Sequence, residues 1–159
     1  MEFKKLTVVI PCFNEASTLR EIVGRVLSAD ICNLTLEVII VDDASTDNSY
    51  EIAIDLAKND NRICLLRHDN NQGKGAALRN GFKAGTGDVI VIQDADLEYD
   101  PQDYPKLIQP IIDNQADVVY GSRFTDGMQK GLRISYIANR FLTFLSNLLT
   151  GLWISDMET

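Results

Sequence analysis

The sequence contains few cysteines, no excess of basic residues and no long uninterrupted apolar run. Its three cysteines are scattered and form no CxxC pair, which argues against a disulfide framework or a zinc site and fits a reducing compartment. Acidic residues outnumber basic ones 23 to 15, which gives the chain a net charge of -8. Nucleic acid is therefore a poor candidate for its main partner, because a protein that binds nucleic acid usually needs a basic face. The N-terminus lacks the apolar core and cleavage site of a signal peptide. We therefore expect a cytoplasmic protein that does not bind nucleic acid.

Short apolar segments alternate with amphipathic helical segments along most of the chain. The pattern predicts strands at residues 6–10, 36–41, 63–66, 89–93 and 118–120, with helices between them. Strands that alternate with helices across short loops are typical of an α/β fold with a mostly parallel sheet, covered by helices on both faces. With 45% hydrophobic residues, the 159-residue chain is long enough for one globular domain with a sizeable core.

Polar clusters follow the first four predicted strands, at residues 11–15, 42–47, 71–75 and 94–98. The carboxyl ends of parallel strands lie at one edge of a sheet, and open α/β sheets bind their ligands beyond that edge. We therefore expect the four clusters to gather around one ligand site.

The densest cluster contains Asp94, Asp96 and Glu98. Neighbouring carboxylates repel each other unless a cation lies between them, and magnesium prefers one or two carboxylates together with substrate phosphates. The cluster therefore predicts a metal–diphosphate site. A solvated turn is one alternative, and an aspartyl nucleophile of the phosphatase kind, which usually lies on the first strand, is another. An EF-hand is excluded, because Tyr99 and Pro105 stand where that loop needs glycine and glutamate.

Taken in order, the polar segments resemble the motifs of the family 2 glycosyltransferases, whose nucleotide-sugar-binding domain has the GT-A fold. Within that family the chain is most similar to the polyprenyl-phosphate sugar transferases related to dolichyl-phosphate mannose synthase. The matching segments are Asn71-Gln-Gly-Lys-Gly75, Asp94-Ala-Asp-Leu-Glu98, Tyr120-Gly-Ser-Arg-Phe124 and Asp156-Met-Glu-Thr159. The resemblance implies a GT-A catalytic core over residues 1–131, and we expect residues 132–159 to form an apolar helix and the start of an acceptor-side segment. The chain ends without a further strand or cap, which predicts that it is a fragment of a longer protein.

The resemblance also implies roles for individual residues. The expected nucleotide-sugar contacts are Pro11, Asn14, Glu15, Asp42, Asp43, Gly73, Lys74, Asp94 and Ala95. Asp42 is the expected contact to the nucleoside, whereas helix capping is the alternative role for Asp43. Lys74 either balances the charge of the donor or is a solvated surface residue.

The metal, Mg²⁺ or Mn²⁺, is expected to stabilise the leaving diphosphate from a site formed by Asp94, Asp96 and Glu98. The residues expected to be catalytic are Asp96, Arg123 and Asp156. Arg123 and Arg133 are expected to hold an acceptor phosphate, because the guanidinium fork fits phosphate oxygens. Asp156 resembles a catalytic base, with a polar helix end as the alternative, and a surface ion pair is the alternative for Arg133.

Residues 132–154 predict a mainly apolar helix that is too mixed for a membrane span. We expect this helix either to pack on the sheet or on a later segment of the protein, or to lie at a membrane interface. The resemblance as a whole implies an inverting enzyme that moves a sugar from a UDP- or GDP-sugar to a polyprenyl phosphate at the cytoplasmic surface of a membrane. Both a monomer and an oligomer are compatible with the sequence. The alternatives are synthesis of a polysaccharide, nucleotide-sugar binding without turnover, and nucleotidyl transfer with release of pyrophosphate.

Overall fold

Four parallel strands form the sheet, in the order β3-β2-β1-β4, in a computed structural model that describes residues 2–121. The strands are β1 (Lys5–Cys12), β2 (Thr35–Asp42), β3 (Ile63–Arg67) and β4 (Val89–Ile92). The helices are α1 (Leu19–Ser28), α2 (Ser49–Asn59), α3 (Lys74–Ala84) and α4 (Tyr104–Ile112), with the short 3-10 helix η1 (Pro101–Asp103) before α4. The predicted α/β class with a parallel sheet is confirmed.

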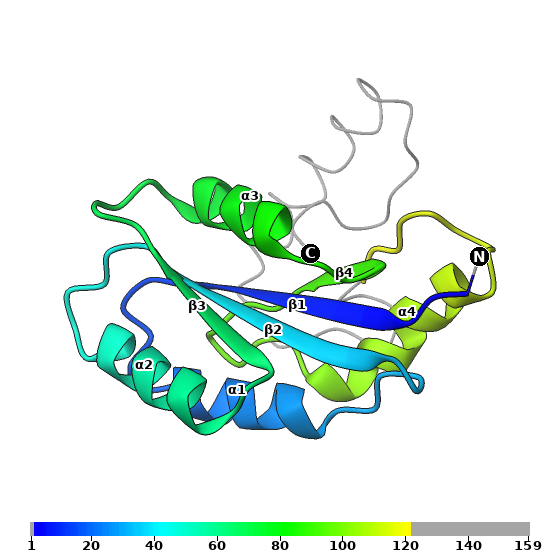
Figure 1. Ribbon diagram of the computed structural model, residues 1–159, viewed down its shortest axis with the longest axis horizontal. Helices are drawn as coiled ribbons and strands as arrows, with labels where there is room; N and C mark the ends of the chain where they lie inside the picture. The colour runs from blue at the N-terminus through cyan, green and yellow to red at the C-terminus, as the bar shows by residue number, and fades with distance from the viewer. Residues whose placement is uncertain (1, 122–159) are drawn as a thin grey trace, which may run out of the picture. The chain divides into compact units, whose positions relative to one another are not determined.

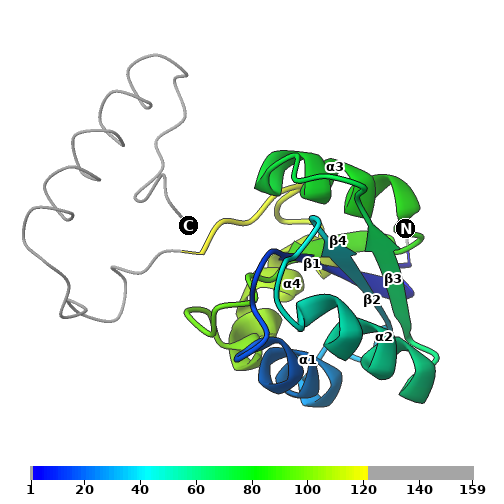
Figure 2. The same cartoon turned by 90° about the vertical axis from the view of Figure 1, so that its left-hand side faces the viewer.

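Helices cover both faces of the sheet: α1, α2 and α4 lie on one face, and α3 lies on the other (Figures 1 and 2). The side chains of β1 alternate between these layers, as they must along a strand. Leu6, Val8 and Ile10 belong to the larger core cluster, whereas Val9 packs in a second cluster with Ala77 of α3. Burial on both sides explains why the central strands are almost continuously apolar in sequence.

Helix α3 lies close to the sheet because Gly81 has no side chain. A Cβ atom added at Gly81 would collide with the side chain of Val9 on β1. The close approach holds α3 on β1, and the first turn of the helix, which contains Lys74, lies at the carboxyl edge of the sheet. Lys74 belongs to the polar cluster predicted at residues 71–75 and lies in this first helical turn.

Residues 2–116 form one compact unit. The strand predicted at residues 118–120 is wrong for the structure, which has no strand there and leaves Val118 and Tyr120 each 63% exposed. A strand of three residues forms too few hydrogen bonds to persist without a neighbouring strand. Among residues 2–121, no helix has both the length and the apolar character needed to cross a membrane. The predicted domain boundary after residue 131 lies outside the described residues.

Candidate active site

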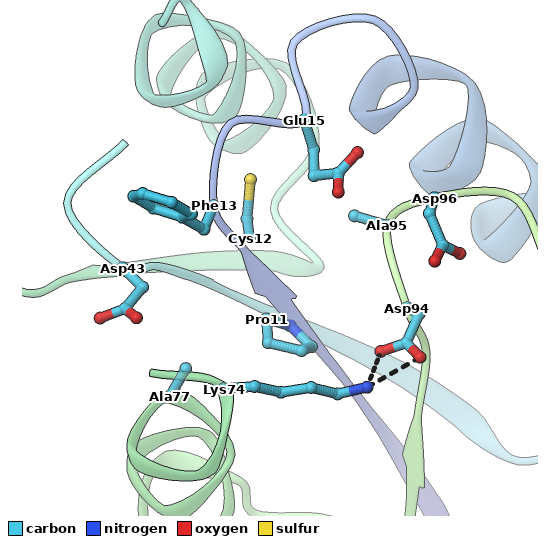
Figure 3. A pocket seen from close by; sticks show the side chains of 10 residues that line it. All are labelled: Pro11, Cys12, Phe13, Glu15, Asp43, Lys74, Ala77, Asp94, Ala95 and Asp96. Carbon is cyan, nitrogen blue, oxygen red and sulfur yellow. Dashed lines mark hydrogen bonds and ion pairs between the residues drawn. The ribbon is translucent and has the colours of Figure 1, made fainter. Parts of the chain in front are cut away.

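A pocket of about 210 Å³ lies at the carboxyl edge of the sheet (Figure 3). Among the predicted site residues, those that line it are Pro11, Glu15, Asp43, Lys74, Ala95, Asp94 and Asp96. Cys12 and Phe13, from the predicted cluster at residues 11–15, also line it, as does Ala77, although no individual role was predicted for these three. The structure therefore brings together residues that are up to 85 positions apart, from Pro11 to Asp96, as the topology of a parallel sheet predicts.

The loop that carries Asp94 and Asp96 is anchored by the buried side chain of Gln93. The Nε2 atom of Gln93 donates hydrogen bonds of 3.1 Å to the main-chain oxygens of Asp94 and Tyr99. Its Oε1 atom accepts a hydrogen bond of 2.9 Å from the hydroxyl of Tyr104. Burial raises the pKa of Tyr104 well above its usual value, so this hydroxyl stays protonated and remains a donor. The acidic loop is thereby fixed to the first turn of α4.

Asp96 lines the pocket, but Glu98, two residues further on, does not. The Oδ1 atom of Asp96 accepts a hydrogen bond of 3.0 Å from the backbone N–H of Glu98, across a tight turn in which Leu97 has φ +66°. Glu98 is exposed and does not line the pocket. Among residues 2–121, no three His, Cys, Asp or Glu side chains are grouped to hold a metal. The expected third ligand, Glu98, is therefore not brought to Asp94 and Asp96.

Asp43, rather than Asp42, faces the pocket. Adjacent residues at a strand end point in opposite directions, and Asp42 is fully buried, with its Oδ2 atom 3.4 Å from Nε of Arg67. Asp42 Oδ1 lacks a hydrogen-bond partner within the described part of the chain. Of these two predicted nucleotide-sugar contacts, Asp43 lines the pocket and Asp42 does not.

Three hydrogen bonds hold the carboxylate of Asp43. The backbone N–H groups of Gln72 and Gly73 donate to it at 2.9 and 2.7 Å, and Nδ1 of His68 lies 2.6 Å from it. Burial alone would raise the pKa of Asp43, but these bonds outweigh burial and hold the pKa below its usual value. Asn80 contacts the other ring nitrogen of His68 at 2.7 Å. Asp43 is thus an ionised carboxylate that orders the loop leading into α3.

Lys74 contributes a positively charged side chain to the pocket lining. It follows Gly73, whose φ of +86° suits a residue without a side chain, and it begins α3. Its Nζ atom lies 2.6 and 2.8 Å from the two carboxylate oxygens of Asp94 (Figure 3). The side chain of Lys74 is 58% exposed, whereas that of Asp94 is 22% exposed.

The loops after β1 and β2 are braced against each other beside the pocket. The Oδ1 atom of Asn14 accepts a hydrogen bond of 2.8 Å from the backbone N–H of Thr46, and the backbone N–H of Asn14 donates to the hydroxyl of Ser45 at 3.1 Å. Asn14 therefore supports the site from outside the pocket lining.

Burial raises the pKa of the Cys12 thiol to about 11, which keeps this pocket residue protonated and unreactive at neutral pH.

Three residues predicted to act on the acceptor side, Arg123, Arg133 and Asp156, lie outside the described residues. Of the other predicted residues, Gly73 and Asn14 support the pocket without lining it. Gln93, His68 and Tyr104 are supporting residues that sequence analysis missed. Gln93 is a polar residue at the end of an otherwise apolar predicted strand, which marks it as unusual but does not reveal its partners.

Acidic side chains and a lysine gather at the carboxyl edge of the parallel sheet, which is where open α/β sheets bind their ligands. The model of glycosyl transferase family 2 matches residues 7–157. The chain belongs to this family, and the predicted family is confirmed.

Two curated relatives share the predicted branch of the family. The chain is 37% identical to a dolichol-phosphate mannosyltransferase of Pyrococcus furiosus, over 77% of this chain and 34% of that protein. It is 30% identical to a UDP-N-acetylglucosamine–dolichyl-phosphate N-acetylglucosaminyltransferase of Methanococcus voltae, over 100% of this chain and 68% of that protein. The chain therefore spans about a third of the first relative and about two thirds of the second.

Solved structures agree on the fold. The mannosyltransferase PcManGT of Pyrobaculum calidifontis, in complex with GDP-Man and Mn²⁺, matches with a TM-score of 0.55 and 29% identity, over 65% of this chain and 30% of that chain. S. aureus TarS 1-349 in complex with UDP matches with a TM-score of 0.62 and 21% identity, over 79% of this chain and 38% of that chain. The predicted GT-A fold is confirmed.

Proposed function

We propose that the protein transfers a sugar from a UDP- or GDP-sugar to a polyprenyl phosphate, with Mg²⁺ or Mn²⁺. The observation that carries this proposal is the convergence of Asp43, Lys74, Asp94 and Asp96 on one pocket at the carboxyl edge of the sheet. The names of the two curated relatives, both of which act on dolichyl phosphate, support the acceptor class.

Asp43 is proposed to receive the nucleoside. Its carboxylate is ionised, and His68, Gln72 and Gly73 fix its direction. It can therefore accept hydrogen bonds from N–H or O–H groups of a nucleoside. A carboxylate whose direction is fixed before binding loses little entropy when the ligand arrives. Asp43 therefore takes the role that sequence analysis gave to Asp42.

Asp94 and Asp96 are proposed to hold the divalent ion. Both line the pocket, and their oxygens are the ligands that hard cations prefer. Two protein carboxylates suffice, because magnesium commonly completes its shell with waters and substrate phosphates. The residues present therefore fit such an ion without Glu98. When bound, the ion neutralises negative charge on the departing diphosphate.

The proposed reaction is a single displacement with inversion. An oxygen of the acceptor phosphate forms a bond to the anomeric carbon, and the bond from that carbon to the diphosphate oxygen breaks. The bonding electron pair leaves with the nucleoside diphosphate. Because a phosphate acceptor is already anionic, the step needs no proton transfer, and Asp156 is proposed to orient groups.

The acceptor side is proposed to lie in the later part of the protein. Arg123 and Arg133 would hold the acceptor phosphate through the fork of the guanidinium group. With a lipid-linked acceptor the protein would work at a membrane surface, and the site is proposed to face the cytoplasm.

Transfer of labelled sugar tests the proposal. The full-length protein is incubated with GDP-mannose or UDP-N-acetylglucosamine, Mn²⁺ and a short polyprenyl phosphate, and lipid-linked sugar is extracted. We expect transfer by the wild type, at least a hundredfold less by Asp94→Asn, and wild-type transfer by Asp113→Asn, which changes an exposed carboxylate at the end of α4. Donor binding without transfer would favour a binding module, and full activity of Asp94→Asn would contradict the proposed site.

A further inference from the structure

We infer that Lys74 is a built-in counter-ion that competes with the divalent metal for Asp94 and gives way when a nucleoside diphosphate binds. The inference rests on the function proposed above and concerns the order in which the ligands of the same site are accepted.

The ammonium group of Lys74 occupies both oxygens of Asp94. The distances of 2.6 Å to Oδ1 and 2.8 Å to Oδ2 show one cation shared between them. A divalent ion on Asp94 would use the same oxygens, and two cations in contact with one carboxylate repel each other. The metal therefore binds weakly while Lys74 stays in place.

Lys74 is the partner able to move. Its side chain is 58% exposed and its charge lies at the end of a flexible stem, whereas the loop of Asp94 is anchored by Gln93. The backbone before Lys74 is fixed, because Asp43 holds the N–H groups of Gln72 and Gly73. The ammonium group can therefore leave Asp94 by rotation of its own side chain.

A diphosphate in the pocket supplies the alternative partner. Lys74 is the first residue of α3, a helix of 11 residues whose first turn lies at the pocket. Phosphate oxygens bind favourably at the N-terminus of a helix, so a diphosphate in the pocket can bind beside Lys74. Once the ammonium group turns to a phosphate, both oxygens of Asp94 are released to the metal. Metal and nucleoside diphosphate thus bind cooperatively, and each raises the affinity of the other by the same factor.

The discriminating experiment measures Mn²⁺ affinity with and without nucleotide. Free Mn²⁺ is titrated by electron paramagnetic resonance against the wild type and Lys74→Met, first alone and then with saturating GDP or UDP. Without nucleotide, we expect Lys74→Met to bind Mn²⁺ about five- to tenfold more tightly than the wild type. With nucleotide, the advantage disappears, because the wild-type lysine has already left Asp94.

Two controls separate the ion pair from a general change of charge. Lys83→Met removes an exposed lysine from the last turn of the same helix and is expected to leave Mn²⁺ affinity unchanged. Lys74→Arg keeps the positive charge and is expected to retain the weak affinity of the wild type. Circular dichroism confirms that each variant is folded.

Failure of this inference can be distinguished from failure of the proposed function. Equal or weaker Mn²⁺ affinity of Lys74→Met without nucleotide, together with intact nucleotide binding, would overturn the inference and leave the proposed function standing. Absence of nucleotide-dependent Mn²⁺ binding in every variant would overturn the proposed function and this inference with it.

Discussion

The hydroxyl of Tyr104 donates a hydrogen bond of 2.9 Å to Oε1 of Gln93 in the interior of the protein. The amide of Gln93 in turn donates to the main-chain oxygens of Asp94 and Tyr99. One buried side chain therefore joins the first turn of α4 to the acidic loop, and the shape of that loop is set before any ligand arrives.

Tyr104→Phe is expected to lower the free energy of unfolding by about 1–3 kcal/mol, because it leaves Oε1 of the buried Gln93 without its donor. Urea denaturation measures the loss. Tyr120→Phe makes the same chemical change on a side chain that is 63% exposed, and it is expected to have no measurable effect. An equal effect of the two substitutions would show that the buried hydrogen bond contributes nothing specific.

The acidic loop could be predicted from the sequence, but its support could not. A run of apolar residues followed by Asp94 and Asp96 is a local pattern, and strand topology predicts where it lies. The partnership of Gln93 with Tyr104 spans a loop and a helix turn, and it depends on packing that no local pattern encodes. A tyrosine in the first turn of an apolar helix is equally compatible with an ordinary core residue.

The choice between Asp42 and Asp43 shows a second limit. Successive side chains of a strand point to opposite faces, and both faces of the second strand are apolar, so its pattern does not show which acid faces the site. The sequence predicted the end of the second strand at residue 41, whereas β2 ends at Asp42 and Asp43 follows it. Periodicity identified both acids as candidates, but only the three-dimensional strand end shows which one lines the pocket.

The two acids make a matched test of that assignment. Asp43→Asn is expected to weaken nucleoside diphosphate binding about tenfold or more, because it removes a charged acceptor and loosens the loop at Gly73. Asp42→Asn alters a buried carboxylate that does not line the pocket, so its main effect should be on stability. Isothermal titration calorimetry and urea denaturation measure the two quantities. The opposite pattern would return the nucleoside contact to Asp42.

Two glycines in helices should respond in opposite ways to alanine. Gly81→Ala is expected to destabilise the protein by about 1–3 kcal/mol, because the new Cβ atom collides with Val9 on β1. Gly24→Ala, in α1, meets no atom within 4 Å and should stabilise the protein by about 0.4–1 kcal/mol through the unfolded chain. Thermal unfolding of both variants checks the sign. A stabilising Gly81→Ala would contradict the close packing of α3.

Stability at low pH is expected to depend on Glu37, which does not line the pocket. Lys5, Thr7 and Thr86 donate hydrogen bonds to its carboxylate. Burial opposes ionisation, but the hydrogen bonds from these residues outweigh it and lower the pKa of Glu37 from 4.5 to about 2. A lowered pKa stabilises the folded state above pH 4.5, and this stabilisation is lost as the pH falls toward 2.

Glu37→Gln is therefore expected to be less stable than the wild type at pH 7, by a difference on the order of 3 kcal/mol that disappears toward pH 2. Urea denaturation across this pH range measures it. Glu2→Gln, which changes a side chain that is 85% exposed, should follow the wild type throughout. Parallel curves for wild type and Glu37→Gln would contradict the role given to this cluster.

Calorimetric titration of GDP- and UDP-sugars into the protein, with and without Mn²⁺, tests the central claim most directly. We expect one of the two donors to bind in a manner that depends on Mn²⁺, and Asp94→Asn to lose that dependence, because Asp94 and Asp96 line the pocket together with Asp43. Binding of a donor with equal affinity in the presence and absence of Mn²⁺, by wild type and Asp94→Asn alike, would contradict the account.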